Sequence, residues 1–461
     1  MSKGTTGVSP LIPIFAAATI SVFIGLVVSF FSARSFLTVA VLLVVLGFVS
    51  AYSTLVFLGI QGNRKAIAIY FGLLIFLADA SLRASGTEAG TLDMQSLAKL
   101  MMWGGGLLIA IFHFVKIKSV LFKTKPLLLT IYALFAMLSS IWSSTPLYSF
   151  GAGVALLSVV AICALVTVML EQEQLIKVIS VALTIFLILS ITRIAVYLLA
   201  GTGMGDVRYS GFAGSPNNLG RIGGLLLLFM WLQHQLSKKV SVKGLAPYLI
   251  GIAALVLSQS RTAMIAAALS IWASLSTKRR LTLIATSFFA ALIITPLVAY
   301  DIVSPEQGAQ AISRGGTVGE VTTLTGRTYI WTYGWRKFQQ SPVYGHGYAA
   351  TREFMPKEYF TMYGWTTNTL HNTVLQSLVT TGVIGTALIL FIWLLQAKQF
   401  LRRKSSYRDA IFTLVVVCGI TEAGIVGAMP SVITVLWGIS LFWSEPSDTE
   451  RQLNSGKAYS E

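Results

Sequence analysis

Side chains that could do chemistry are concentrated between Thr325 and Gly385, in a chain that is otherwise largely apolar. Arg327 and His371 are the main candidates in this stretch. A guanidinium can bind a phosphate through two parallel hydrogen bonds, and an imidazole can accept a proton near neutral pH. The stretch begins in a hydrophilic segment and ends in a new apolar run, so we expect both side chains at the edge of a membrane. The structural alternatives are an arginine that pairs with Glu320 and a histidine that only caps a helix.

Three further charged residues interrupt apolar or glycine-rich runs. Arg261 lies between two apolar segments, and Glu422 lies inside one, where a buried carboxylate needs a partner such as Arg261 or Arg327. Arg208 opens a turn rich in glycine, serine and asparagine (208–218), which could approach a sugar or a phosphate. Charge at membrane depth is costly and indicates function by default. An interfacial arginine at 261 and an ordinary connecting loop after 208 are the alternatives.

Neighbouring residues could support these candidates. Asn368 and Asn372 are close enough in sequence to orient the ring of His371. The sequence predicts a helix over 325–340, capped by Thr325 and ended by proline. Its aromatic residues recur on one face, and these are Trp331, Trp335 and Phe338.

The composition predicts an all-α, polytopic membrane protein. Apolar residues make up 55% and charged residues 11%, with a mean hydropathy of +0.75, whereas soluble domains carry about 25% charged residues. The net charge of +17 comes from lysines and arginines in short loops between apolar runs, the positive-inside pattern. We therefore expect a lipid bilayer, and not nucleic acid, as the partner. Cys163 and Cys418 both lie in apolar runs, which argues against a disulfide or a thiolate metal site.

A membrane-spanning helix needs about 20 apolar residues, and the chain contains about fourteen such runs. They are 10–31, 36–60, 65–82, 97–115, 127–142, 149–170, 175–200, 217–236, 245–259, 262–277, 281–300, 371–397, 409–427 and 430–444. Twelve spans are the alternative, because 245–259 and 262–277 are short and could form a hairpin. The first run is long enough to be a retained anchor. The basic loops place both termini in the cytoplasm and the segments 83–96, 143–148, 201–216 and 301–370 outside.

These runs divide the chain into five parts. They are N-terminal helices (1–126), central helices with the Ser-Arg-Thr turn (127–300), a large and partly helical periplasmic loop (301–370), C-terminal helices (371–444) and a cytoplasmic tail (445–461). The large loop is dense in aromatic residues, which argues against disorder. The sequence contains no phosphate-binding loop, no Cys/His metal spacing and no Asp-x-Asp pair, so we expect no cofactor and no metal.

Several short motifs occur in a recognisable order. They are Ser139–Pro146, Gly211–Asn217, Ser260-Arg261-Thr262, Gly326-Arg327 with Trp331, Pro342 with Gly345 and Gly347, and His371-Asn372 with Gly382 and Gly385. Their order and predicted placement, over about 130–440, resemble the O-antigen ligase and O-antigen polymerase superfamily of bacterial envelopes. About the first hundred residues carry no such motif.

The resemblance implies a membrane glycosyltransferase that uses a polyprenyl-diphosphate-linked glycan as donor. In such a protein two arginines hold the donor diphosphate and the histidine works beside the reacting hydroxyl. These roles map onto Arg327, Arg261 and His371, with Arg208 as a competitor for the second arginine. Glu422 could hold an arginine in place. Because the sequence offers no carboxylate pair for double displacement, we expect an inverting, metal-independent reaction.

The acceptor distinguishes the remaining hypotheses. A polymerase that joins repeat units of an exopolysaccharide or O-antigen is favoured by the large aromatic loop and the number of spans. A ligase that passes the glycan to the lipid A core is the alternative, and a lipid-linked glycan transporter is the alternative of another class. We expect the bacterial inner membrane as location, a site facing the periplasm, and a flippase and a chain-length regulator as partners.

Overall fold

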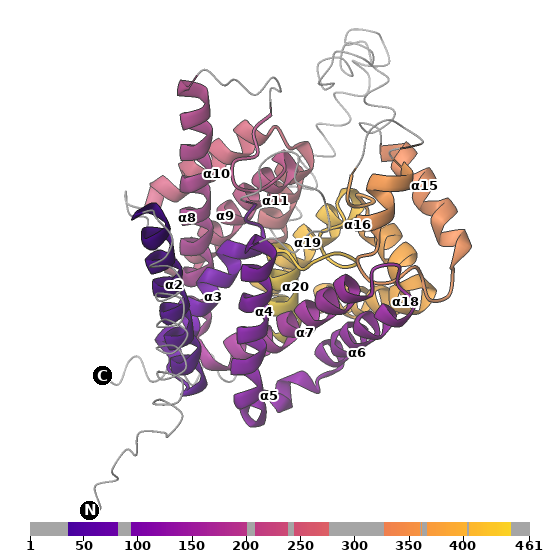
Figure 1. Cartoon of the computed structure of the whole chain (residues 1–461), viewed down its shortest axis with the longest axis horizontal. Coiled ribbons are helices and arrows are strands. Elements are labelled where there is room, and N and C mark those ends of the chain that lie inside the picture. The colour runs from indigo at the N-terminus through magenta and orange to yellow at the C-terminus, as the bar shows by residue number, and fades with distance from the viewer. Residues whose placement is uncertain are drawn as a thin grey trace, which may run out of the picture. The chain divides into compact units, whose positions relative to one another are not determined.

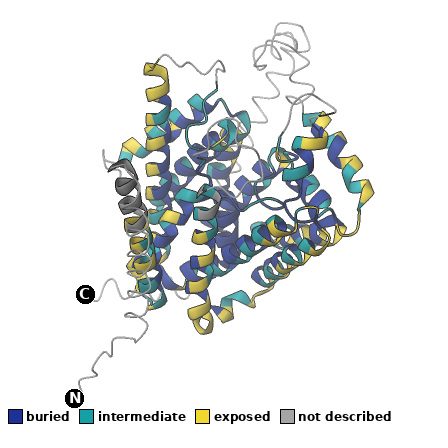
Figure 2. Cartoon of the chain, in the orientation of Figure 1, coloured by how far each residue is buried: buried dark blue, intermediate teal, exposed yellow. Residues whose placement is uncertain are grey.

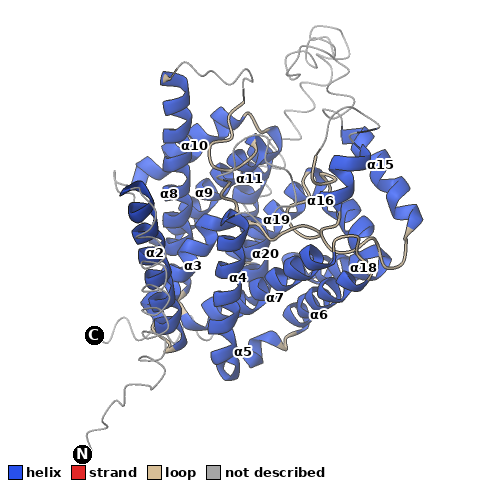
Figure 3. Cartoon of the chain, viewed as in Figure 1, coloured by secondary structure: helices blue, strands red, loops and turns tan. Residues whose placement is uncertain are grey.

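The computed structural model describes residues 36–81, 94–200, 208–237, 244–275, 327–359, 361, 367–402 and 405–443. Within these ranges the chain forms helices and loops and no strand (Figure 3), so the all-α prediction is confirmed. The expected spans at 10–31 and 281–300, residues 301–326, 360 and 362–366 of the large loop, and the tail lie outside the described residues. The chain divides into two compact units, Met1–Ile67 and Ala68–Glu461. The candidate residues all belong to the second.

The first unit contains α2 (Phe36–Ile60), and α3 (Arg64–Ala78) runs from the first unit into the second. The remaining elements of the second unit are α4 (Met94–Phe112), α5 (Phe114–Leu121), α6 (Thr124–Leu138), η1 (Ser139–Ile141), α7 (Pro146–Met169), α8 (Gln172–Leu199), α9 (Pro216–Ser237), α10 (Leu245–Ser258), α11 (Arg261–Ser274), α15 (Arg327–Gln340), α16 (Thr351–Phe354), η3 (Met355–Tyr359), α18 (Thr373–Arg402), α19 (Ser406–Thr421) and α20 (Val432–Phe442) (Figure 1).

Four of the described helices are long and apolar enough to cross a membrane. They are Thr124–Ile141, Pro146–Met169, Gln172–Leu199 and Thr373–Arg402. A fifth is counted if Ala98–Phe112 and Phe114–Leu121, bent by 96°, form one broken span. Each coincides with a predicted span, and together they confirm a multi-pass membrane protein.

The core of the second unit is built around α7, which lies against α4, α6 and α20. α8 is apolar on all sides, but only one side is packed: Leu183 and Phe186 are buried, whereas Val181 and Ile185 are 49% exposed. Figure 2 shows such exposed residues along the outer side of α8. An apolar side chain left outside a packed core suits a helix that faces lipid.

One predicted loop is a helix. We expected the lysine-rich residues after the span 97–115 to form a cytoplasmic connection, but α5 occupies 114–121. Its Ile117 is buried, while Lys116 and Lys118 are exposed. α5 is bent by 96° from α4 and therefore does not continue it.

The predicted helix at 325–340 is α15, which ends two residues before Pro342 as expected. Thr325, its expected cap, lies outside the described residues. Trp331 and Phe338 pack against a buried cluster that includes Tyr333 of α15 itself, Phe354 of α16 and Leu370, which precedes α18. Trp335 lies against Phe338, with 5.1 Å between the ring centroids, but stays half exposed.

α18 is broken at Gly382, whose φ of 63° and ψ of −166° are not helical. The loop 342–347 enters this break and bonds to both sides of it. His346 N–H donates to Val379 O (2.9 Å), and Val383 N–H donates to Pro342 O (2.9 Å). Buried backbone groups must be paired, so the loop supplies the hydrogen bonds that the broken helix lacks.

Glycine is required where loop and helix meet. A Cβ on Gly382 would collide with the carbonyl of Val343, and a Cβ on Gly345 would lie 2.5 Å from the carbonyl carbon of Thr380. Gly345 and Gly382 belong to the motifs that carry the family resemblance, and this close backbone contact explains why both are glycine.

We predict that Gly382→Ala destabilises the protein. The conformation of Gly382 costs other residues about 1–3 kcal/mol, and the collision with Val343 adds to this. Gly104→Ala is the matched control, because an added Cβ there meets nothing within 4 Å. Chemical unfolding in mixed micelles should separate the two variants. Equal stability would contradict the account of the broken helix.

Candidate active site

The predicted span 409–427 is wrong at its carboxyl end, because α19 stops at Thr421. Residues 422–431 are not helical, and α20 begins at Val432 after a capping box made by Ser431 and Thr434. Two glycines and Pro430 follow the break and disfavour helix. Glu422 therefore ends a helix instead of lying inside one, and its side chain is free to point toward other elements.

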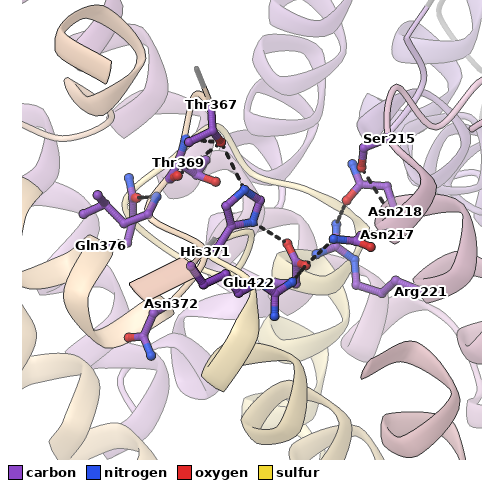
Figure 4. A network of polar contacts seen from close by, with 12 residues as sticks. Ser215, Asn217, Asn218, Arg221, Thr367, Thr369, His371, Asn372, Gln376 and Glu422 are labelled. Carbon is purple, nitrogen blue, oxygen red and sulfur yellow. Dashed lines mark hydrogen bonds and ion pairs between the residues drawn. The ribbon is translucent and has the colours of Figure 1, made fainter. Parts of the chain in front are cut away.

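Glu422 is the centre of a buried polar network (Figure 4). Its Oε1 accepts hydrogen bonds from Arg327 Nη2 (3.0 Å) and from Asn217 Nδ2 (2.8 Å). Its Oε2 lies 3.2 Å from His371 Nδ1. The side chains of Glu422 and Arg327 are only 13% and 16% exposed. Three segments that are far apart in the sequence therefore meet at one carboxylate.

These contacts fix the tautomer of His371. A carboxylate only accepts hydrogen bonds, so Nδ1 carries the hydrogen and Nε2 of the neutral ring has the free electron pair. Nε2 lies 3.0 Å from Thr367 Oγ1. The backbone of His371 has a φ of 48°, which is uncommon for a residue with a side chain. The segment that precedes α18 is therefore bent to turn this ring toward Glu422.

Asn372 has a different position from the one we expected. Its Oδ1 accepts from Leu375 N–H (2.9 Å) at the start of α18, and its Nδ2 donates to Ile420 O (3.0 Å). Asn372 thus caps the helix and ties it to α19, while Thr367 and Glu422 hold the ring of His371. Trp331 supports the same segment, because its Nε1 donates to Leu370 O (3.1 Å).

The two candidate second arginines differ in their contacts. Arg208 Nη2 donates to Asn217 Oδ1 (2.6 Å), and Nε donates to Ser258 O (3.1 Å). Arg208 is therefore joined to Glu422 through Asn217. Arg261 begins α11 and is half-buried, and no hydrogen bond or ion pair links it to Glu422 within the part of the chain that the structure describes. Of the two partners that we expected for Glu422, Arg327 makes the contact.

A further arginine, Arg221, was not among the expected residues. It is 5% exposed on α9, where its Nη2 bonds Asn218 Oδ1 (2.8 Å) and lies 4.0 Å from Asp79 Oδ1. Its guanidinium lies over Gly424, where a Cβ would come within 2.9 Å of Nη1. The signal in the sequence was a lone arginine inside the apolar run 217–236.

Among the described residues of this region, the arginines outnumber the carboxylates. Arg208, Arg221 and Arg327 contribute three positive charges, and Glu422 and Asp79 contribute two negative ones. Arginines that already have one partner keep further N–H groups for a planar oxyanion. The arrangement therefore suits a phosphate bound beside the ring of His371.

We predict that Glu422→Gln destabilises the protein by about 1–3 kcal/mol, because Arg327 would be left buried without a counter-charge. The double variant with Arg327→Met should cost less than the sum of the single changes, with a coupling free energy of about 1 kcal/mol or more. Lys357→Gln is the control, since Lys357 is 73% exposed and its ion pair with Glu353 contributes about 0.5 kcal/mol or less. The free energy of unfolding is measured in micelles. If the changes of the two single variants simply add in the double variant, the pairing of Glu422 with Arg327 is refuted.

Comparison with known proteins agrees with the motifs. Residues 246–390, which include Arg261, Arg327 and His371, match the family model described as O-Antigen ligase. The chain is also 28% identical over 285 residues to the exopolysaccharide production protein ExoQ of Rhizobium meliloti (strain 1021). That alignment covers 56% of this chain and 61% of the relative, so it spans less than two thirds of that protein. The predicted resemblance to the O-antigen ligase and O-antigen polymerase superfamily is thereby confirmed.

Proposed function

We propose that this protein is a membrane glycosyltransferase that moves a glycan from a polyprenyl diphosphate to an acceptor hydroxyl. The observation that carries the proposal is the contact of Glu422 with Arg327 and His371. A group suited to a phosphate and a group suited to a proton are thus held by the same carboxylate, at the end of apolar helices. The tail of the donor would lie between those helices, with the sugar and diphosphate at their ends.

His371 is proposed to act on the acceptor. Glu422 keeps Nδ1 protonated, so Nε2 can take the proton of the acceptor hydroxyl as its oxygen attacks the anomeric carbon. The hydroxyl would take the place that Thr367 Oγ1 occupies, 3.0 Å from Nε2. As the new C–O bond forms, the bond between the anomeric carbon and the diphosphate oxygen breaks. Its electron pair leaves with the diphosphate.

The arginines are proposed to stabilise this leaving group. Arg327 and Arg208 are tied to the network, and Arg261 lies in the segment that matches the family model. Preorganised cations directed at a developing charge lower the barrier without a metal. Glu422 already binds Arg327 and His371, so it is poorly placed to act as a nucleophile. Single displacement with inversion is therefore the proposed course.

A polymerase of repeat units is the proposed form of this activity. The support is the similarity to a protein named for exopolysaccharide production. Transfer to the lipid A core is the second candidate, supported by the O-Antigen ligase model. In either case the site would face the periplasm from the inner membrane, with a flippase and a chain-length regulator as partners. A transporter would bind the same donor and form no product.

The acceptor decides between these candidates. Purified protein is incubated with polyprenyl-diphosphate repeat units, first alone and then with lipid A core, each with and without EDTA. Longer lipid-linked glycans from the donor alone are expected. Transfer that requires the core would identify the ligase instead, and a complete absence of turnover would exclude both enzymes.

We expect His371→Ala to slow product formation by about 10²–10⁴-fold, the usual contribution of an acid or base. Arg327→Ala should lower it by at least about 10²-fold. Arg336→Ala is the control, because Arg336 is exposed on the same helix as Arg327. Both site variants should insert into membranes normally, which immunoblotting and gel filtration can check. Normal activity in the two site variants would remove these residues from the mechanism.

A further inference from the structure

A cavity of about 680 Å³ lies next to the Glu422 network. Ser215 and Asn218 line it on one side, and Asn368 lines it on another. Asn218 bonds Arg221, and Asn368 follows Thr367, the partner of His371 Nε2. Asn368 therefore brings the segment that carries His371 to the edge of this space. The volume is typical of sites for small ligands.

Arg352 faces this cavity and a smaller one of about 220 Å³ that adjoins it. Its Nη1 donates to Tyr148 Oη (2.7 Å), and its guanidinium carbon lies 5.0 Å from the centroid of that ring. Its Nε is buried and has no hydrogen-bond partner among the described residues. The carboxylate next to it in sequence, Glu353, pairs with Lys357 instead (3.1 Å).

A cation in this setting favours an anionic ligand. No carboxylate of the described residues lies within 4.0 Å of Arg352. Lys99 adds a second positive charge to the cavity lining. Asp79 also lines it, but this carboxylate faces Arg221 at 4.0 Å and accepts from Val432 N–H (3.3 Å). Among the described residues, Arg352 is thus a cation of the cavity lining that no carboxylate pairs.

The rest of the lining suits a sugar. Tyr148 provides an aromatic ring, and Gln95, Asn218 and Asn368 provide side-chain amides that both donate and accept hydrogen bonds. Rings and amides of this kind match the apolar faces and the hydroxyl groups of a pyranose. The Glu422 network already supplies arginines for a diphosphate, so the cavity lined by Arg352 is left for the acceptor.

We propose that this cavity binds the acceptor end of the glycan and that Arg352 selects a sugar with an anionic substituent, such as the carboxylate of a uronic acid. The proposal rests on the proposed function and names its acceptor class. The carboxylate of such a sugar would accept hydrogen bonds from the Arg352 guanidinium that lines the cavity, while the sugar ring lies near Tyr148. One of its hydroxyl groups would then approach His371.

Binding of cellobiouronic acid and of cellobiose tests the proposal, because the two disaccharides differ by one carboxylate. With the full-length protein in nanodiscs and no donor present, titration calorimetry should give at least tenfold tighter binding of the acid. Arg352→Gln should remove that preference, and Arg352→Lys should restore part of it. Arg336→Gln, a change of an exposed arginine, should leave it intact. Equal affinities in the unaltered protein, or an unchanged preference in Arg352→Gln, would overturn the proposal.

Pyrophosphate binding to two variants distinguishes an acceptor role of the cavity from a donor role. Inorganic pyrophosphate should bind Arg352→Gln as it binds the unaltered protein, and it should bind Arg327→Gln at least tenfold more weakly. A loss of pyrophosphate binding in Arg352→Gln would assign the cavity to the donor and refute the acceptor role. Because no turnover is needed, a protein that binds the acid through Arg352 but transfers no glycan would contradict only the proposed function.

Discussion

The structure of the candidate site depends on one constraint, which is that the Glu422 carboxylate is removed from water and must be paired. Arg327 and His371 satisfy it directly, and Asn217 extends the pairing to Arg208. An unpaired carboxylate at this position would destabilise the fold. The contacts that prevent this also hold Arg327, His371 and Asn217 in place. The same contacts that satisfy the carboxylate therefore set the positions of a phosphate-binding group and a proton-accepting group.

The backbone around this carboxylate must leave the helical path, and its polar groups need partners as well. Gln376 supplies them at the centre: its Nε2 donates to Gly427 O (2.7 Å) and Thr351 Oγ1 (2.8 Å), and its Oε1 accepts from Leu370 N–H (3.0 Å). One side chain of α18 thus joins three irregular segments. Non-helical backbone within a membrane protein is tolerated where protein groups pair it, and here that pairing also fixes the segment that carries His371.

The helices could be predicted and the contacts between them could not. Runs of apolar residues gave the spans that became α7, α8 and α18, because hydropathy and length decide them locally. The helix α5 is too short and too rich in lysine to be predicted by that criterion. His371 and Glu422 are 51 positions apart, and no local sequence pattern predicts their contact. Hydrogen-bonding residues such as Asn372 are especially ambiguous, because a helix cap and a ring support require the same side chain.

The arginines show why residue type alone is not enough to assign a site. Arg208, Arg221, Arg327 and Arg352 all approach the same region, yet each has a different set of partners. Arg221 faces a carboxylate, and Arg327 shares one with His371. Arg352 binds the hydroxyl of a tyrosine and keeps a buried N–H free. On the proposed function, the arginines of the Glu422 network hold the two phosphates of the donor, and the acceptor occupies the cavity lined by Arg352. A cation without a carboxylate partner is most useful on the acceptor side, where it can distinguish an acidic sugar from a neutral one.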